Sequence, residues 1–144
     1  MLKKNKNIAK LIIKYKEATP APPIGAVLGS KGINIMSFCK EFNLKSNKDN
    51  FFKKGTPVTV YVNIYINKKF SFIIKTPPTS FLLKNILNIK KGSSQTNIKI
   101  VGEINNAQIN EIAKIKIPDL NSCNLEKAKK IIIGTAKSMG IHIK

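Results

Sequence analysis

Arginine and tryptophan are absent from this 144-residue chain, which has only one histidine, two cysteines and seven acidic residues. General acid–base catalysis needs titratable side chains brought close together, and no two of the acids form an evident pair in the sequence. The stretch GAVLGSKG also lacks the GxxxxGK[ST] spacing of a phosphate-binding loop. The sequence therefore predicts that the protein is not an enzyme.

Metal ligands are equally scarce. Cys39 and Cys123 form no CxxC pair, and His142 is the only histidine that could join them. A zinc site is not expected from this set, and a disulfide framework cannot be inferred from it. We expect both thiols to be reduced and buried. No metal and no cofactor are predicted.

Long apolar runs are missing too. None exceeds three residues, whereas a membrane-spanning helix needs about 20. Residues 2–16 alternate in polarity and lack the apolar centre of a secretory signal. The lysines are scattered along the chain instead of gathering on one amphipathic face. A membrane is therefore not an expected partner.

What the chain does have is positive charge. All 26 basic residues are lysines and the net charge is +19, while 42% of the residues are hydrophobic, enough for a core. This balance points first to nucleic acid. A protein that is merely soluble and basic is the alternative, although self-repulsion would then go unrelieved. Lysine lacks the bidentate fork that reads guanine, so recognition of a nucleic acid should rest on its shape and its backbone, not on base-specific contacts.

The first half reads as β-α-β-β. Residues 8–15 alternate and predict a strand whose better apolar face carries Ala9, Leu11, Ile13 and Tyr15. Residues 33–43 have helical spacing, with Asn34 as the N-cap. Residues 44–56 are polar and predict a loop, and residues 57–66 and 70–75 predict a β-hairpin.

The second half is expected to be mostly helical. Lys75 to Ser80, with Pro77-Pro78 at its centre, predicts a short stiff linker in which Thr79 or Ser80 caps the next helix. Helices are predicted over 80–89, 105–117 and 124–140, with Asn105 and Gln108 as a capping pair, Pro118 as one stop and Gly140 as the other. Residues 98–101 predict a short strand. The fold class is α+β, with domains 1–75 and 76–144.

Two motifs in the second half suit RNA binding. Lys90 to Ser94, KKGSS, reads either as a phosphate-contacting loop or as a solvated surface loop. In GTAKSMG, Gly134 lies inside a predicted helix, where glycine costs about 1 kcal/mol relative to alanine. Together with Thr135 and Ser138 it makes a flat face for an RNA minor groove, or a face for close helix packing.

The motifs TPAPPIG, LGSKGINIMSFCKEFN, FIIKTPPTSFLLK, KKGSS, IVG, PDLN and GTAKSMG, in this order and spacing, resemble the family of the bacterial-type large-subunit ribosomal protein number eleven. The resemblance covers nearly the whole chain. It implies a C-terminal domain that binds large-subunit rRNA and an N-terminal domain that faces the factor site of the GTPase-associated centre. The implied partners are this rRNA, the ribosomal stalk-base protein, elongation factor G and other translational GTPases, and thiopeptide antibiotics.

The resemblance also implies roles for individual residues. For rRNA binding these are Pro77, Pro78, Ser80, Lys84, Lys90, Lys91, Gly92, Ser93, Ser94, Asn121, Gly134, Thr135, Lys137, Ser138, Met139 and Gly140. The stiff proline-rich surface that faces factors and antibiotics is implied for Pro20, Pro22, Pro23, Gly25 and Gly29, although a turn that only connects strand to helix is the alternative. Lys3 and Lys40 are candidates for methylation.

This sequence departs from the family pattern at Ala26, where most bacterial members have proline, and at Lys31, where many have histidine. The expected location is the ribosome, in a bacterial cytoplasm or in an organelle, mitochondrion or plastid, because an arginine-rich transit peptide is missing. The rival class is a non-ribosomal basic architectural protein, which would bind DNA and unrelated RNA equally.

Overall fold

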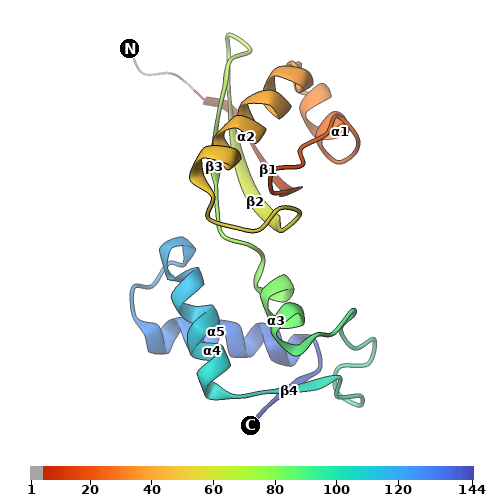
Figure 1. Ribbon diagram of the computed structural model, residues 1–144, viewed down its shortest axis with the longest axis vertical. Coiled ribbons are helices and arrows are strands. Elements are labelled where there is room, and N and C mark those ends of the chain that lie inside the picture. The colour runs from red at the N-terminus through yellow and green to blue at the C-terminus, as the bar shows by residue number, and fades with distance from the viewer. Residues whose placement is uncertain (1–4) are drawn as a thin grey trace. The chain divides into compact units, whose positions relative to one another are not determined.

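The structure is a computed structural model that describes residues 5–144. The chain divides into two compact units, Met1–Lys75 and Thr76–Lys144. Both mix helices and strands (Figure 1), so the predicted α+β class is confirmed.

The first unit is a three-stranded antiparallel sheet with two helices. Its elements are β1 (Asn5–Lys14), α1 (Ile24–Gly29), α2 (Ile35–Asp49), β2 (Pro57–Tyr65) and β3 (Phe70–Ile74). The strand order is β1-β2-β3, so the central strand is the second one in the sequence. Ile13 pairs with Val58, and Val62 pairs with both Ala9 and Phe72.

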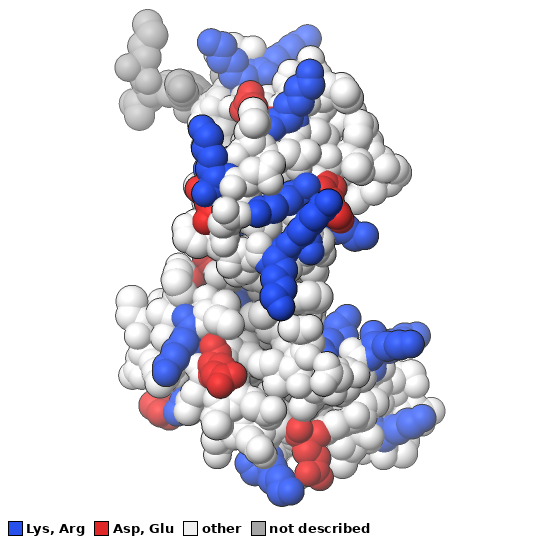
Figure 2. All heavy atoms as spheres, in the orientation of Figure 1, with Lys and Arg blue, Asp and Glu red and all other residues white. Residues whose placement is uncertain are grey.

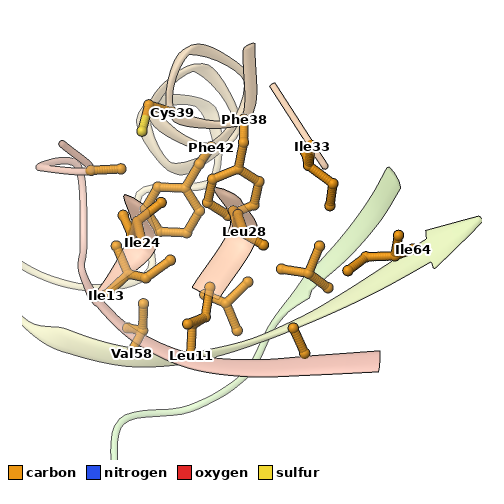
Figure 3. Close-up of a cluster of buried hydrophobic side chains, with 14 of the residues drawn as sticks. Leu11, Ile13, Ile24, Leu28, Ile33, Phe38, Cys39, Phe42, Val58 and Ile64 are labelled. Carbon is orange, nitrogen blue, oxygen red and sulfur yellow. The ribbon is translucent and has the colours of Figure 1, made fainter. Parts of the chain in front are cut away.

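The core of this unit lies between the helices and one face of the sheet. Ala9, Leu11, Ile13 and Tyr15 are buried, which confirms the predicted apolar face of the first strand. Phe38 and Phe42 point from α2 toward the sheet, as Figure 3 shows. The ring centroid of Phe38 lies 5.5 Å from that of Phe72 in an edge-on arrangement. The aromatic pair thus fixes α2 on the sheet by specific ring contacts as well as by burial.

The first unit differs from the sequence prediction at the end of α2 and in one additional helix, α1. The predicted N-cap is confirmed, since the Asn34 side chain accepts hydrogen bonds from the backbone N–H groups of Met36 and Ser37. However, α2 continues to Asp49, well into the predicted loop 44–56, because its inner face goes on with buried Ser46. The helix α1 was not predicted, although Ile24 and Leu28 lie four residues apart and both are buried.

The second unit contains α3 (Thr79–Leu87), β4 (Gly102–Ile104), α4 (Asn106–Lys116), a 3₁₀ turn (Ile117–Asp119), α5 (Leu125–Ser138) and β5 (Ile141–Ile143). The helices pack around one core, and β4 pairs with β5 in parallel. The fully or nearly fully buried residues of this core are Leu83, Ile104, Ile109, Ile112, Ala113, Ala128, Ile132, Ala136 and Ile141. The backbone N–H of Asn105 donates to Gln108 Oε1 at 3.0 Å, as the predicted capping pair requires.

Two expectations for this unit were wrong, and one strand was missed. The strand predicted over 98–101 lies instead at Gly102–Ile104, and Ile98 and Ile100 are exposed. Their alternation with polar residues resembles a strand, but no sheet edge reaches them. The N-cap of α3 is Pro78, so neither Thr79 nor Ser80 has that role. Strand β5 was not predicted, because three residues are too few to establish a period.

The predicted linker is shorter than Lys75 to Ser80. Thr76 donates its backbone N–H to Asp119 Oδ2 at 2.5 Å, and its hydroxyl bonds the same oxygen. Lys116 Nζ donates to Thr76 Oγ1 at 2.9 Å and to the carbonyl oxygen of Pro77 at 3.1 Å. Thr76 and the buried Pro77 are therefore part of the second unit. Among residues 5–144, no helix is both long and apolar enough to cross a membrane.

Candidate nucleic-acid interface

The C-terminal part of α5 presents a face of small and hydroxyl side chains. Gly134, Lys137 and Ser138 are exposed and Thr135 is half-buried, while Ile132 and Ala136 are buried on the other side. The Thr135 hydroxyl donates to the carbonyl oxygen of Ile131 at 3.2 Å. The Ser138 hydroxyl donates to that of Thr135 at 2.6 Å. Each hydroxyl oxygen keeps its acceptor capacity, which is what a 2′-hydroxyl donor needs.

Gly134 is free of helix packing within its unit. A Cβ atom built at Gly134 meets nothing within 4 Å. The alternative hypothesis, that Gly134 allows close packing of another helix, would require atoms of that helix near this Cβ position. The surface above Gly134 is therefore open, and the helix backbone is accessible to a flat ligand.

The loop that carries KKGSS docks onto the end of this same helix. Ser93 donates its backbone N–H to the carbonyl oxygen of Met139 at 2.9 Å, and Val101 donates to that of Gly140 at 3.0 Å. A Cβ atom at Gly92 would lie 3.4 Å from the Met139 oxygen. The two motifs, separate in the sequence, thus form one surface.

Gly140 makes this docking possible. Its φ is +78°, and a Cβ atom there would lie 2.6 Å from Ser93 Cβ and 3.0 Å from the carbonyl oxygen of Lys99. Only glycine combines this backbone conformation with so close an approach. Gly140 is buried, so its contribution is to position the loop, as the predicted helix stop also requires.

The other predicted RNA-binding residues differ in exposure. Lys90, Lys91, Ser94 and Asn121 are exposed. Partly buried are Pro78, Ser80, Lys84, Gly92, Ser93 and Met139. Pro77 is buried and is held by Lys116, so it lies beneath the surface. Among these residues, the hydrogen bond from Ser93 to Met139 joins the KKGSS loop to the end of α5.

Sequence reasoning missed part of the exposed face of α5. Lys127, Lys130 and Ile131 are exposed, and Ile131 keeps 45% of its surface accessible. Lys127, Ile131, Gly134 and Ser138 follow a spacing of four, three and four residues, which places them along one side of the helix. The helical period of the exposed positions was the signal that could have found them.

The charge of this surface is positive. KKGSS and GTAKSMG contribute three lysines and no acid. Figure 2 shows lysine side chains spread over the visible face, with fewer acidic side chains between them. Some lysines are paired, as Lys129 Nζ is with Glu126 Oε1 at 2.9 Å. The three lysines of KKGSS and GTAKSMG can neutralise phosphates.

The proline-rich segment of the first unit is a separate surface. Pro20, Pro22, Pro23 and Gly29 are exposed, and the segment borders a groove of about 820 Å³. A Cβ atom at Gly25 would lie 2.5 Å from the carbonyl oxygen of Pro20, so the chain folds tightly back on itself here. Pro22 and Pro23 line the groove beside this tight turn.

The two cysteines have different surroundings. Cys39 is buried as expected, and desolvation raises the pKa of its thiol. Cys123 is exposed, which contradicts the expectation of burial, because it lies in the turn before α5 and not on a helix face. Within residues 5–144, no three His, Cys, Asp or Glu side chains come together to hold a metal ion.

The second unit therefore offers an open helix face, a docked lysine-rich loop and a surplus of positive charge. These features define an RNA-binding protein, and two family models agree. Residues 75–143 match ribosomal protein L11, RNA binding domain, and residues 9–70 match ribosomal protein L11, N-terminal domain. The chain belongs to the ribosomal protein L11 family of the large ribosomal subunit, as the motifs suggested.

Proposed function

We propose that the protein binds the GTPase-associated region of large-subunit rRNA and supports the action of translation factors at the stalk base. The observation that carries this proposal is the docking of the KKGSS loop on α5 through the Ser93–Met139 hydrogen bond. It gathers lysines, hydroxyls and an open glycine onto one surface. Such a surface suits folded RNA better than a protein partner.

The second unit would bind in two ways at once. Gly134 lets the α5 backbone approach a minor groove, where the hydroxyl oxygens of Thr135 and Ser138 accept from 2′-hydroxyls. Lys90, Lys91 and Lys137 contact phosphates on either side. Because the chain has no arginine, RNA shape carries the specificity.

The first unit would contact the translation factors and the antibiotics. Its proline-rich edge at Pro20, Pro22 and Pro23 is exposed beside a groove, and rigid prolines lose little entropy when a partner binds. We assign to this edge elongation factor G, other translational GTPases and thiopeptide antibiotics, with the stalk-base protein as a further partner. The protein would be structural, without catalysis.

Methylation and location complete the proposal. Lys40 is exposed on α2 and accessible to a methyltransferase, whereas Lys3 lies outside the described residues. The protein would work on a ribosome of a bacterial cytoplasm or of an organelle.

A competition experiment tests the proposal. The full chain is bound to labelled GTPase-centre RNA and challenged with an RNA duplex or a DNA duplex of equal length. We expect unlabelled GTPase-centre RNA to compete at least about 10³-fold better than either duplex, the lower end of the usual specificity range. Equal competition by all three would identify the rival, an architectural protein that binds any duplex.

A further inference from the structure

A small hollow lies at the C-terminal end of α3, outside the core, and shares only Lys90 with the surface formed by KKGSS and GTAKSMG. Its lining residues are Phe81, Lys84, Asn85, Asn88, Ile89 and Lys90, and its volume is about 310 Å³. The chain makes it by turning back after α3. Asn88 has a φ of +52°, and Ile89 donates its backbone N–H to the carbonyl oxygen of Lys84 at 3.0 Å. This turn brings Ile89 and Lys90 against the last turns of the helix.

Phe81 stands on the side of α3 that faces away from the core. Leu83 is buried in the core of the second unit, and Leu82, Ile86 and Leu87 pack against that core. Phe81, Lys84, Asn85 and Asn88 are spaced three, one and three residues apart, so they share the other side of the helix. A half-exposed aromatic ring beside two polar amides is therefore available to a ligand.

The chemistry of the hollow is that of a nucleotide site. The Phe81 ring and the Ile89 side chain offer apolar surfaces between which a base can stack. The amides of Asn85 and Asn88 have both donors and acceptors for the edge of a base. Lys84 and Lys90 supply positive charge for its phosphate, and the lining contains no carboxylate. At about 310 Å³ the hollow lies at the small end of ligand sites, which suits one base.

We propose that this hollow holds a single unstacked nucleotide of the bound RNA, with its base on Phe81 and its phosphate between Lys84 and Lys90. The inference rests on the proposed function and extends it. Lys90 links the hollow to the α5 surface, since it begins the loop whose Ser93 bonds to Met139. One RNA can therefore contact the open helix face and place an extruded base in the hollow. Proteins commonly stack aromatic side chains on such unpaired bases.

The first test is the affinity of the full chain for GTPase-centre RNA. Phe81→Leu keeps an apolar side chain but removes the ring, so we expect affinity to fall about 5- to 150-fold, as for the loss of one stacked base. Phe81→Tyr keeps the ring and should bind like the wild type. Phe51→Leu is the matched control, because Phe51 is 76% exposed and lies in the first unit. Thermal melts confirm that each variant is folded.

The second test is chemical probing of the RNA bases in the complex. Wild-type protein should protect one unpaired base that Phe81→Leu leaves reactive, and Lys84→Gln should reduce the salt slope by about 0.7–0.9. Wild-type affinity and an unchanged footprint for folded Phe81→Leu would overturn the inference. A preference of the wild type for GTPase-centre RNA over both duplexes would meanwhile keep the proposed function intact. Loss of that preference in the wild type would defeat the proposed function itself.

Discussion

Ser93 and Met139 are joined by a backbone hydrogen bond of 2.9 Å, which fastens the KKGSS loop to the end of α5. The bond depends on Gly140, the next residue, whose Cβ position would lie 2.6 Å from Ser93 Cβ. The local geometry of one glycine thus determines whether two distant motifs act as one surface.

Gly140→Ala should release this loop. The substitution adds strain at a φ of +78° and a contact with Ser93 that cannot be relieved without moving backbone. We expect a loss of about 1–3 kcal/mol in the free energy of unfolding. Hydrogen exchange should accelerate at the amides of Ser93 and Val101, which bond to Met139 and Gly140. An unchanged exchange rate at both amides would show that the loop does not depend on Gly140.

Gly134→Ala should have the opposite effect on stability. Nothing lies within 4 Å of the new methyl group, and alanine is the better helix former by about 1 kcal/mol. The melting temperature of the free protein should stay the same or rise. Affinity for GTPase-centre RNA should fall about 5- to 150-fold, because the methyl would stand between the helix and the RNA. A stabilised variant that binds RNA normally would remove Gly134 from the interface.

RNA affinity should reside in the second unit. The first unit carries more net charge, +12 from 15 lysines and three acids against +7, but both RNA-binding motifs lie after residue 75. A fragment of residues 76–144 should bind GTPase-centre RNA nearly as well as the full chain in filter-binding assays. If some 6 phosphates are neutralised, affinity should fall about 10³-fold between 50 and 200 mM salt. Specific binding by residues 1–75 alone would contradict this assignment.

Pro22→Ser and Pro23→Ser should separate drug binding from RNA binding. Both prolines are exposed at the edge of the groove in the first unit, so their replacement leaves the RNA-binding surface intact. We expect unchanged RNA affinity but weaker thiopeptide protection when the protein–RNA complex is footprinted. Equal protection in wild type and variants would mean that the drug does not contact this edge.

The two thiols should react with a disulfide reagent at very different rates. Exposed Cys123 should react at once in the native protein. Cys39 should react only on unfolding, because burial both shields its thiol and raises its pKa, so little thiolate forms near neutral pH. The native protein should thus titrate one fast thiol, and Cys123→Ser should have none. A fast second thiol would indicate that α2 opens readily.

The sequence predicted the elements that have a strong period or a recognisable cap. The alternation through Leu11 and Ile13 identified the first strand, and Asn34 identified the start of α2. Sequence reasoning missed the elements whose stability comes from tertiary contacts. Helix α1 is only six residues long, and beyond Phe42 the only buried residue of α2 is the polar Ser46. Such segments have little intrinsic preference and are helical because the core lies beneath them.

The candidate site was predictable in its parts but not in its assembly. KKGSS and GTAKSMG were recognisable as motifs, but their junction is a backbone hydrogen bond, which no side-chain pattern records. The hollow beside Phe81 was missed for a similar reason. It depends on the left-handed conformation of Asn88, which reverses the chain after α3. Without that turn, Phe81 reads as one more apolar residue of a helix.

The strand order of the first unit constrains how it assembles. Strands β2 and β3 are connected by a tight turn at Tyr65–Lys69, so they can close as a hairpin within about 1–10 μs. Strand β1 pairs with β2, although both helices lie between them in the sequence. Pairing of β1 therefore carries the larger entropic cost of closing a long loop. In pulse-labelled refolding, amides of β2 and β3 should therefore gain protection before those of β1. Earlier protection of β1 would mean that this loop closes before the hairpin has formed.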